Sequence, residues 1–167
     1  IHKDGGLAQK LSIPYGEFGC ISPDGKRIAF TTKSTIGSTW KRYRGGLAAD
    51  IYVYNPETLE SVNISDHEAT DELPMWHGTT IYFLSDRGPE NRLNLWSYDM
   101  NMRLFRQVTT FTDKDVRFPS LGGDAIVFTA GTQMYIYDVL NGSLTDIKVQ
   151  VISDMTAKMP RQENVAS

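Results

Sequence analysis

The sequence predicts an all-β protein, because one two-strand pattern occurs three times and no stretch has helical periodicity. In each copy an apolar strand leads through a loop to a strand that contains tyrosine. The copies are Ile28–Thr31 with Asp50–Asn55, Ile81–Leu84 with Asn94–Asp99, and Ile126–Thr129 with Gln133–Asp138. They lie roughly 40–50 residues apart, which is the repeat length of propeller blades. We therefore expect a partial β-propeller of about three four-stranded antiparallel blades plus an extra N-terminal strand.

The composition excludes several classes of protein. The chain has 167 residues, of which 40% are hydrophobic and 22% charged, as in an ordinary globular domain. A net charge of -3 argues against a nucleic-acid-binding surface. No apolar run approaches the ~18 residues of a membrane helix, so we expect no membrane partner. The single cysteine, Cys20, excludes an internal disulfide, and we expect it to pack in a strand.

The first blade is predicted over residues 18–65, after an extra strand at residues 8–13. A turn of proline, aspartate and glycine at positions 23–25 joins its first two strands. The loop that follows the second strand, Thr32–Ala49, is much longer than its counterparts in the other copies. The four predicted strands are Phe18–Ile21, Ile28–Thr31, Asp50–Asn55 and Glu60–Ser65.

Two further blades follow the same plan, over residues 73–110 and 118–151. Their outer strands are predicted at Leu73–Trp76, Phe105–Thr109, Phe118–Leu121 and Leu144–Val149. The middle blade has a neighbour on each side, so its hairpin Ile81–Asp99 is expected to be the best buried. Residues 1–152 thus form the propeller region, and residues 153–167 a linker or the start of another blade. Because propellers close with about 4–8 blades, we expect the native protein to continue on both sides.

Several phrases of the sequence resemble known propeller families. The phrase SPDGKRIAF at residues 22–30 and the Pro-x-Trp of residues 74–76 are similar to repeats of TolB, of prolyl oligopeptidases and of tricorn proteases. A more specific phrase, WKRYRGG at residues 40–46 followed by DIYVY, resembles the six-bladed N-terminal propeller of the tricorn protease family. The likeness continues through most of the chain, roughly over residues 8–150.

The tricorn resemblance implies a non-catalytic part of a large serine peptidase. In that family two propellers precede a PDZ-like domain and a catalytic core, and the propellers are thought to channel or filter peptides. The nucleophilic serine and its histidine belong to the core, so no catalytic residue is assigned to this chain. The implied partners are peptides, the rest of the parent peptidase and further copies of the full-length protein, and no cofactor is implied.

The candidate binding residues lie in loops at one end of the strands. In a four-stranded blade the loop between the second and third strands shares a face with the connection to the next blade. That face would hold Trp40–Gly46, Asp66–Glu72, Asp86–Arg92 and Thr110–Arg117. Here the basic and aromatic residues would face acidic ones across a peptide channel or docking surface. The candidates are Trp40, Lys41, Arg42, Tyr43, Arg44 and His67. Alternatively, the aromatic residues pack the long loop and the arginines pair with local acids.

Catalytic and metal sites have weaker support. The three histidines lack metal-ligand spacing, and the glycine–serine pairs at 37–38 and 142–143 do not form a nucleophile elbow. For His67 we favour a hydrogen bond that orders its loop over a catalytic role. Two other functions stay open at this point, a TolB-like protein-binding propeller and the propeller of a prolyl oligopeptidase-type enzyme. The sequence contains no recognisable targeting signal, so both a cytoplasmic and a periplasmic location remain possible.

Overall fold

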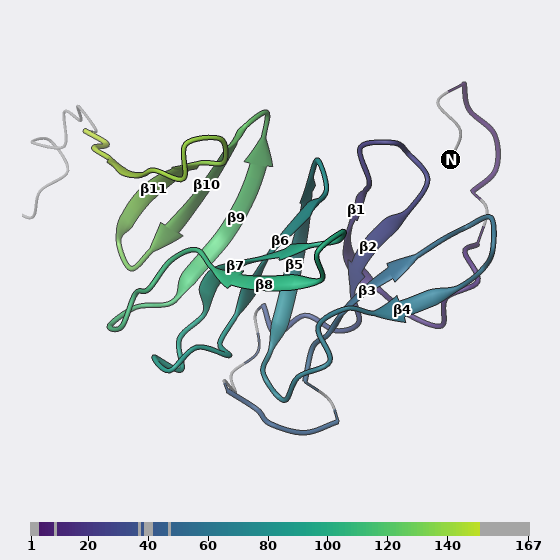
Figure 1. Ribbon diagram of the computed structural model, residues 1–167, viewed down its shortest axis with the longest axis horizontal. Helices are drawn as coiled ribbons and strands as arrows, with labels where there is room; N and C mark the ends of the chain where they lie inside the picture. The colour runs from purple at the N-terminus through teal and green to yellow at the C-terminus, as the bar shows by residue number, and fades with distance from the viewer. Residues whose placement is uncertain (1–3, 9, 37, 39–41, 47, 151–167) are drawn as a thin grey trace, which may run out of the picture.

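A computed structural model of the chain describes residues 4–8, 10–36, 38, 42–46 and 48–150. The regular elements in this part of the chain are all β-strands, and they form three four-stranded antiparallel sheets. The predicted all-β class and blade-like sheets are confirmed. Figure 1 shows the three sheets side by side, with the second between the other two. The described residues include no helix that could cross a membrane.

In each sheet the strands lie in chain order. The first sheet contains β1 (Glu17–Ile21), β2 (Ile28–Thr31), β3 (Ile51–Tyr54) and β4 (Ser61–Asn63). The second contains β5 (Asp71–His77), β6 (Thr80–Ser85), β7 (Asn94–Asp99) and β8 (Leu104–Gln107). The third contains β9 (Val116–Gly122), β10 (Ala125–Ala130), β11 (Gln133–Asp138) and β12 (Leu144–Ile147). Sequential antiparallel strands of this kind are the arrangement of a propeller blade.

The three sheets repeat two backbone features. The first strand of each carries a bulge, where one residue has a positive φ. These residues are Phe18 (φ 47°), Leu73 (φ 59°) and Phe118 (φ 52°). At the end of the third strand, a side-chain oxygen of Asn55, Asp99 or Asp138 accepts hydrogen bonds from two N–H groups of the following turn. This Asx turn reverses the chain toward the fourth strand.

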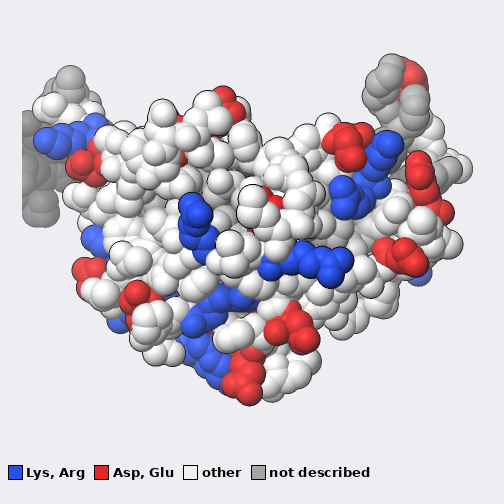
Figure 2. All heavy atoms as spheres, in the orientation of Figure 1, with Lys and Arg blue, Asp and Glu red and all other residues white. Residues whose placement is uncertain are grey.

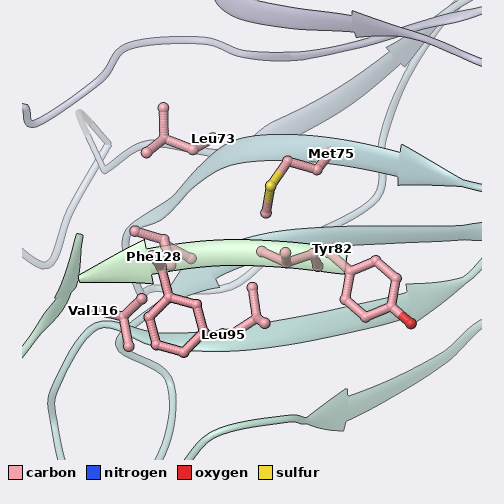
Figure 3. Packing of buried hydrophobic residues seen from close by; sticks show 8 residues of the cluster. Leu73, Met75, Tyr82, Leu95, Val116 and Phe128 are labelled. Atoms are coloured by element: carbon pink, nitrogen blue, oxygen red, sulfur yellow. The ribbon is translucent and has the colours of Figure 1, made fainter. Parts of the chain in front are cut away.

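The hydrophobic core lies mainly between the second and third sheets. Side chains of β5, β6 and β7 meet those of β9 and β10, as Figure 3 shows. The cluster consists of Leu73, Met75, Tyr82, Leu84, Leu95, Val116, Ile126 and Phe128. A smaller cluster joins the first two sheets through Ala29, Val53, Trp76 and Ile81, and Cys20 packs against it from β1. The prediction for Cys20 is thereby confirmed, and burial raises the pKa of its thiol to about 11.

The middle sheet is the best buried of the three, as predicted. In β6 five of the six residues are buried, whereas none of the residues of β11 or β12 is. β6 and β7 each have a hydrogen-bonded neighbour on both sides, and their sheet has another sheet on either face.

The extra strand predicted for residues 8–13 is not present among the described residues of that stretch. Its described residues, 8 and 10–13, have no regular structure and are largely exposed. Alternating side chains alone do not make a strand, because its backbone groups also need a neighbouring strand as hydrogen-bond partner. Among the described residues the first sheet contains β1, β2, β3 and β4, and residues 8 and 10–13 are not part of it. Residues 153–167, predicted as a linker, lie outside the described residues.

Candidate functional site

The candidate site is the set of loops at one end of the strands. We call it the rim and define it as the described residues of the segments 32–50, 65–70, 86–93 and 108–115. These segments follow the second and fourth strands of the first two sheets, so they gather on one side of the molecule, at the bottom of Figure 1. Figure 2 shows basic and acidic groups next to one another there. Loops on a rigid sheet scaffold are a common location for binding residues.

Arg44 is held in place by an ion pair and a backbone hydrogen bond to Asp86. Its Nη1 lies 2.8 and 2.9 Å from the two carboxylate oxygens, and its Nη2 donates to the Asp86 carbonyl at 3.3 Å. The Asp86 side chain is only 3% exposed, and it also accepts the Thr70 N–H at 2.9 Å. Asp86 therefore ties together three segments of the rim. Arg44 thus pairs with a nearby acid and stabilises the rim. This agrees with the alternative given above, in which the arginines pair with local acids.

A second carboxylate, Glu72, anchors the start of the long loop. It is 2% exposed and lies on β5. It accepts hydrogen bonds from the Thr35 N–H at 2.8 Å and from the hydroxyls of Ser34 and Thr35. The sequence suggested that Glu72 would face the basic residues of positions 40–44. Instead it fixes the backbone of the same loop several residues earlier.

Arg42 is more accessible to a ligand than Arg44, which is paired with Asp86. It is exposed and has a φ of 55°, and its Nε donates to the Asn91 carbonyl at 2.7 Å. Among the described residues, no carboxylate forms an ion pair with it. Beside it is a cavity of about 30 Å³ that is also lined by Asp86, Asp115 and Arg117. This volume suits a water molecule and is too small for an amino-acid side chain.

The remaining predicted residues have mainly local contacts. Tyr43 is 39% exposed, and its ring lies close above Gly45, where an added Cβ would come within 2.8 Å of the phenol oxygen. His67 Nδ1 accepts the Ala69 N–H at 3.0 Å, the loop-ordering bond that we favoured. Trp40 and Lys41 lie outside the described residues.

Arg87 of the rim forms a buried charged pair with Asp71, the first residue of β5. Arg87 Nη2 lies 2.6 Å from Asp71 Oδ2, and the two side chains are 8% and 0% exposed. The guanidinium is packed among three aromatic rings, with its Cζ 4.3 Å from the centroid of Phe105. Burial raises the pKa of Asp71 to about 6, although the Arg87 charge opposes this rise. The pair connects the start of β5 to the loop after β6.

The raised pKa of Asp71 predicts a pH-dependent stability. Because the folded value, about 6, exceeds the ordinary 3.8, folding favours the protonated carboxyl. The resulting stabilisation is complete below about pH 4 and is lost as the pH rises through 6. Its size is at most about 3 kcal/mol. Denaturant unfolding of the wild type and of Asp71→Asn between pH 4 and 7.5 should show that the substitution removes this slope. Parallel curves for the two proteins would contradict the assignment.

Sequence reasoning missed most residues that build the rim or line its cavity. Asp86 and Arg87 were expected only as members of a loop, and Asn91, Asp115 and Arg117 were not separately weighed. One signal was available, because a Ser-Asp-Arg triplet directly follows the apolar β6. Charges at the end of a buried strand must be paired. Within the described residues, no group of three or more His, Cys, Asp or Glu side chains is arranged to hold a metal ion.

The three consecutive sheets and their shared rim define a segment of a β-propeller. The chain matches the family described as "Tricorn protease N-terminal beta propeller domain" over residues 1–143, and it belongs to this family. A "Tricorn protease homolog" of Saccharolobus solfataricus is 31% identical over 165 residues, which is 99% of this chain. The chain spans only 15% of that relative's length.

Solved structures agree with this assignment. The crystal structure of the tricorn protease superposes with a TM-score of 0.67 and 25% identity, covering 80% of this chain and 13% of the other. TolB from Acinetobacter baumannii superposes with a TM-score of 0.55 and 20% identity, covering 78% of this chain and 31% of the other. The TolB likeness concerns the fold alone. The chain is thus an N-terminal propeller segment of tricorn-like peptidases, and the resemblance of its sequence to that family is confirmed.

Proposed function

We propose that this propeller segment helps to channel or filter peptide substrates toward a C-terminal catalytic core of its parent peptidase, and supplies no catalytic residue itself. Membership of the tricorn family supports a peptide as the molecule handled. The observation that carries the proposal is Arg42, an exposed residue at the rim whose Nε donates to a backbone carbonyl and whose guanidinium forms no ion pair within the described part of the chain. Peptides and the rest of the parent peptidase are the proposed partners.

We propose different roles for Arg42 and Arg44, two of the predicted basic residues. Arg44 and Asp86 make the rim rigid, since their pair is partly buried and both terminal nitrogens of Arg44 donate to Asp86. Arg42 lies two residues before Arg44 in the same loop. Its exposed positive charge would attract acidic peptides. Trp40 and Lys41 are proposed to contribute to the same docking surface on the strength of the sequence alone. Tyr43 and His67 are proposed to shape it.

Arg42→Ala in the full-length parent peptidase should lower kcat/KM for an acidic decapeptide. We expect a loss of about 2- to 5-fold, because an exposed ion pair contributes less than about 1 kcal/mol. A small chromogenic substrate, which needs no guidance by the rim, should be cleaved at the wild-type rate. Both values follow from steady-state kinetics on the purified protein.

The control is Arg106→Ala, which removes an exposed arginine from β8, outside the rim. It should change neither rate, and thermal unfolding should be the same for all three proteins. Equal losses on both substrates would show that Arg42 acts on the catalytic core, and no loss on either would remove Arg42 from the path of the peptide. Serine-inhibitor-sensitive hydrolysis by the 167-residue chain alone would contradict its non-catalytic assignment.

A further inference from the structure

A groove between the first and second sheets opens at the end of the strands opposite to the rim. It has a volume of about 500 Å³. Its walls come from the end of β3, from β4, and from the end of β7 with the turn that follows. The rim, by contrast, begins where β2 and β6 end. The groove therefore shares no residue with the proposed peptide path.

The floor of the groove is apolar. Val53 and Tyr98 lie at its base with 6% and 9% exposure, and they belong to the clusters that join the two sheets. Ile64 and Met100 are partly buried and contact the same clusters. Val62, on the outer strand β4, is 58% exposed and borders the opening. Such a surface can bury one or two aliphatic side chains of a ligand.

The charges of the groove are unequal. Two arginines, Arg27 and Arg103, line it together with one acid, Glu60. Arg27 is partly fixed, since its Cζ lies 5.5 Å from the centre of the Trp76 ring. Arg103 is exposed in the β7–β8 turn, and within the described part of the chain no carboxylate forms an ion pair with it. The lining therefore carries more positive than negative charge, on a chain of net charge -3, and this favours negatively charged ligands.

We propose that this groove binds a short extended peptide segment in which aliphatic residues lie beside glutamate or aspartate. The aliphatic side chains would cover Val53, Ile64 and Met100, and the carboxylates would meet the two arginines. The apolar floor favours a peptide over a free inorganic anion, which would gain nothing from it. The arginines distinguish an acidic peptide from a neutral one.

The test is an NMR titration of the 15N-labelled 167-residue chain with the capped tetrapeptide Glu-Leu-Leu-Glu. Binding should saturate with a Kd on the order of 0.1 mM, which is typical of a small exposed site. The amide signals that shift should be those of β4, of residues 98–103 and of Arg27. The neutral peptide Gln-Leu-Leu-Gln should bind at least about 5-fold more weakly, since it loses about 1 kcal/mol of ion pairing.

Three variants sharpen the assignment. Arg103→Asn removes the charge with a residue that tolerates the φ of 55° found there, and Val62→Glu places an acid at the opening. Each should weaken the acidic peptide about 5-fold or more, whereas Arg106→Gln, in the neighbouring groove, should not. The proposal is overturned by a failure to saturate below about 5 mM, by equal binding of the neutral peptide, or by a loss in Arg106→Gln equal to that in Arg103→Asn. The outcome of this test does not depend on the proposed role of Arg42.

Discussion

Arg87→Ala is expected to lower the free energy of unfolding by about 3–5 kcal/mol, because it leaves the buried carboxylate of Asp71 without its partner. The guanidinium is 2.6 Å from that carboxylate and only 8% exposed. The substitution also removes its packing on Phe105, Phe83 and Trp96. A domain is stable by only about 5–15 kcal/mol, so the loss is a large part of the total. Chemical denaturation at pH 7.5 measures it.

Two controls separate the unpaired charge from the loss of side-chain volume. Arg106→Ala removes an exposed arginine of the same sheet and should change stability by less than about 0.5 kcal/mol. The double variant Asp71→Leu with Arg87→Met removes both charges and keeps the volume, and should recover most of the lost stability. If the double variant is as unstable as Arg87→Ala, the packing on the rings is the main contribution and the ion pair a minor one.

The sequence predicted the central strands of the sheets well because their signal is local. Each is a run of apolar and aromatic residues between turn residues, and three copies of the pattern reinforce one another. The predicted Ile28–Thr31, Asn94–Asp99 and Gln133–Asp138 coincide with β2, β7 and β11. The extra strand at residues 8–13 failed because pairing is not local. Its alternation of side chains contains no information about whether a neighbouring strand is available.

The sequence predicted where the rim lies but not which of its residues pair with one another. The order of strands within a blade places residues 40–46 and 86–92 on one face, and the bonds of Arg44 to Asp86 and of Arg42 to Asn91 confirm that these two loops meet. Which acid pairs with which arginine depends on the distances between loops of different sheets, which the sequence does not contain. Asp86 and Glu72 are therefore the residues that the structure adds.

Phe128→Ala is expected to cost about 3–5 kcal/mol, the usual range for a phenylalanine removed from a packed core. Phe128 lies on β10 and is 1% exposed. Its ring stacks on Tyr135 at a centroid distance of 5.7 Å and meets the edge of Phe111 at 6.3 Å. Phe111 belongs to the connection from the second sheet to the third. The substitution therefore weakens both the third sheet and its attachment to the second.

Local stability in each sheet shows whether Phe128→Ala weakens mainly the third sheet or the whole chain. The third sheet is the least buried, with no buried residue in β11 or β12, so it has few other contacts to retain it. Hydrogen exchange in Phe128→Ala should accelerate more in β10–β12 than in β6 and β7. Phe118→Ala is the matched control, since that side chain is 64% exposed on β9 and should cost less than about 1 kcal/mol. Uniform acceleration across all three sheets would instead mean that the sheets unfold as one cooperative unit, and that the cluster around Phe128 stabilises the first sheet as much as the third.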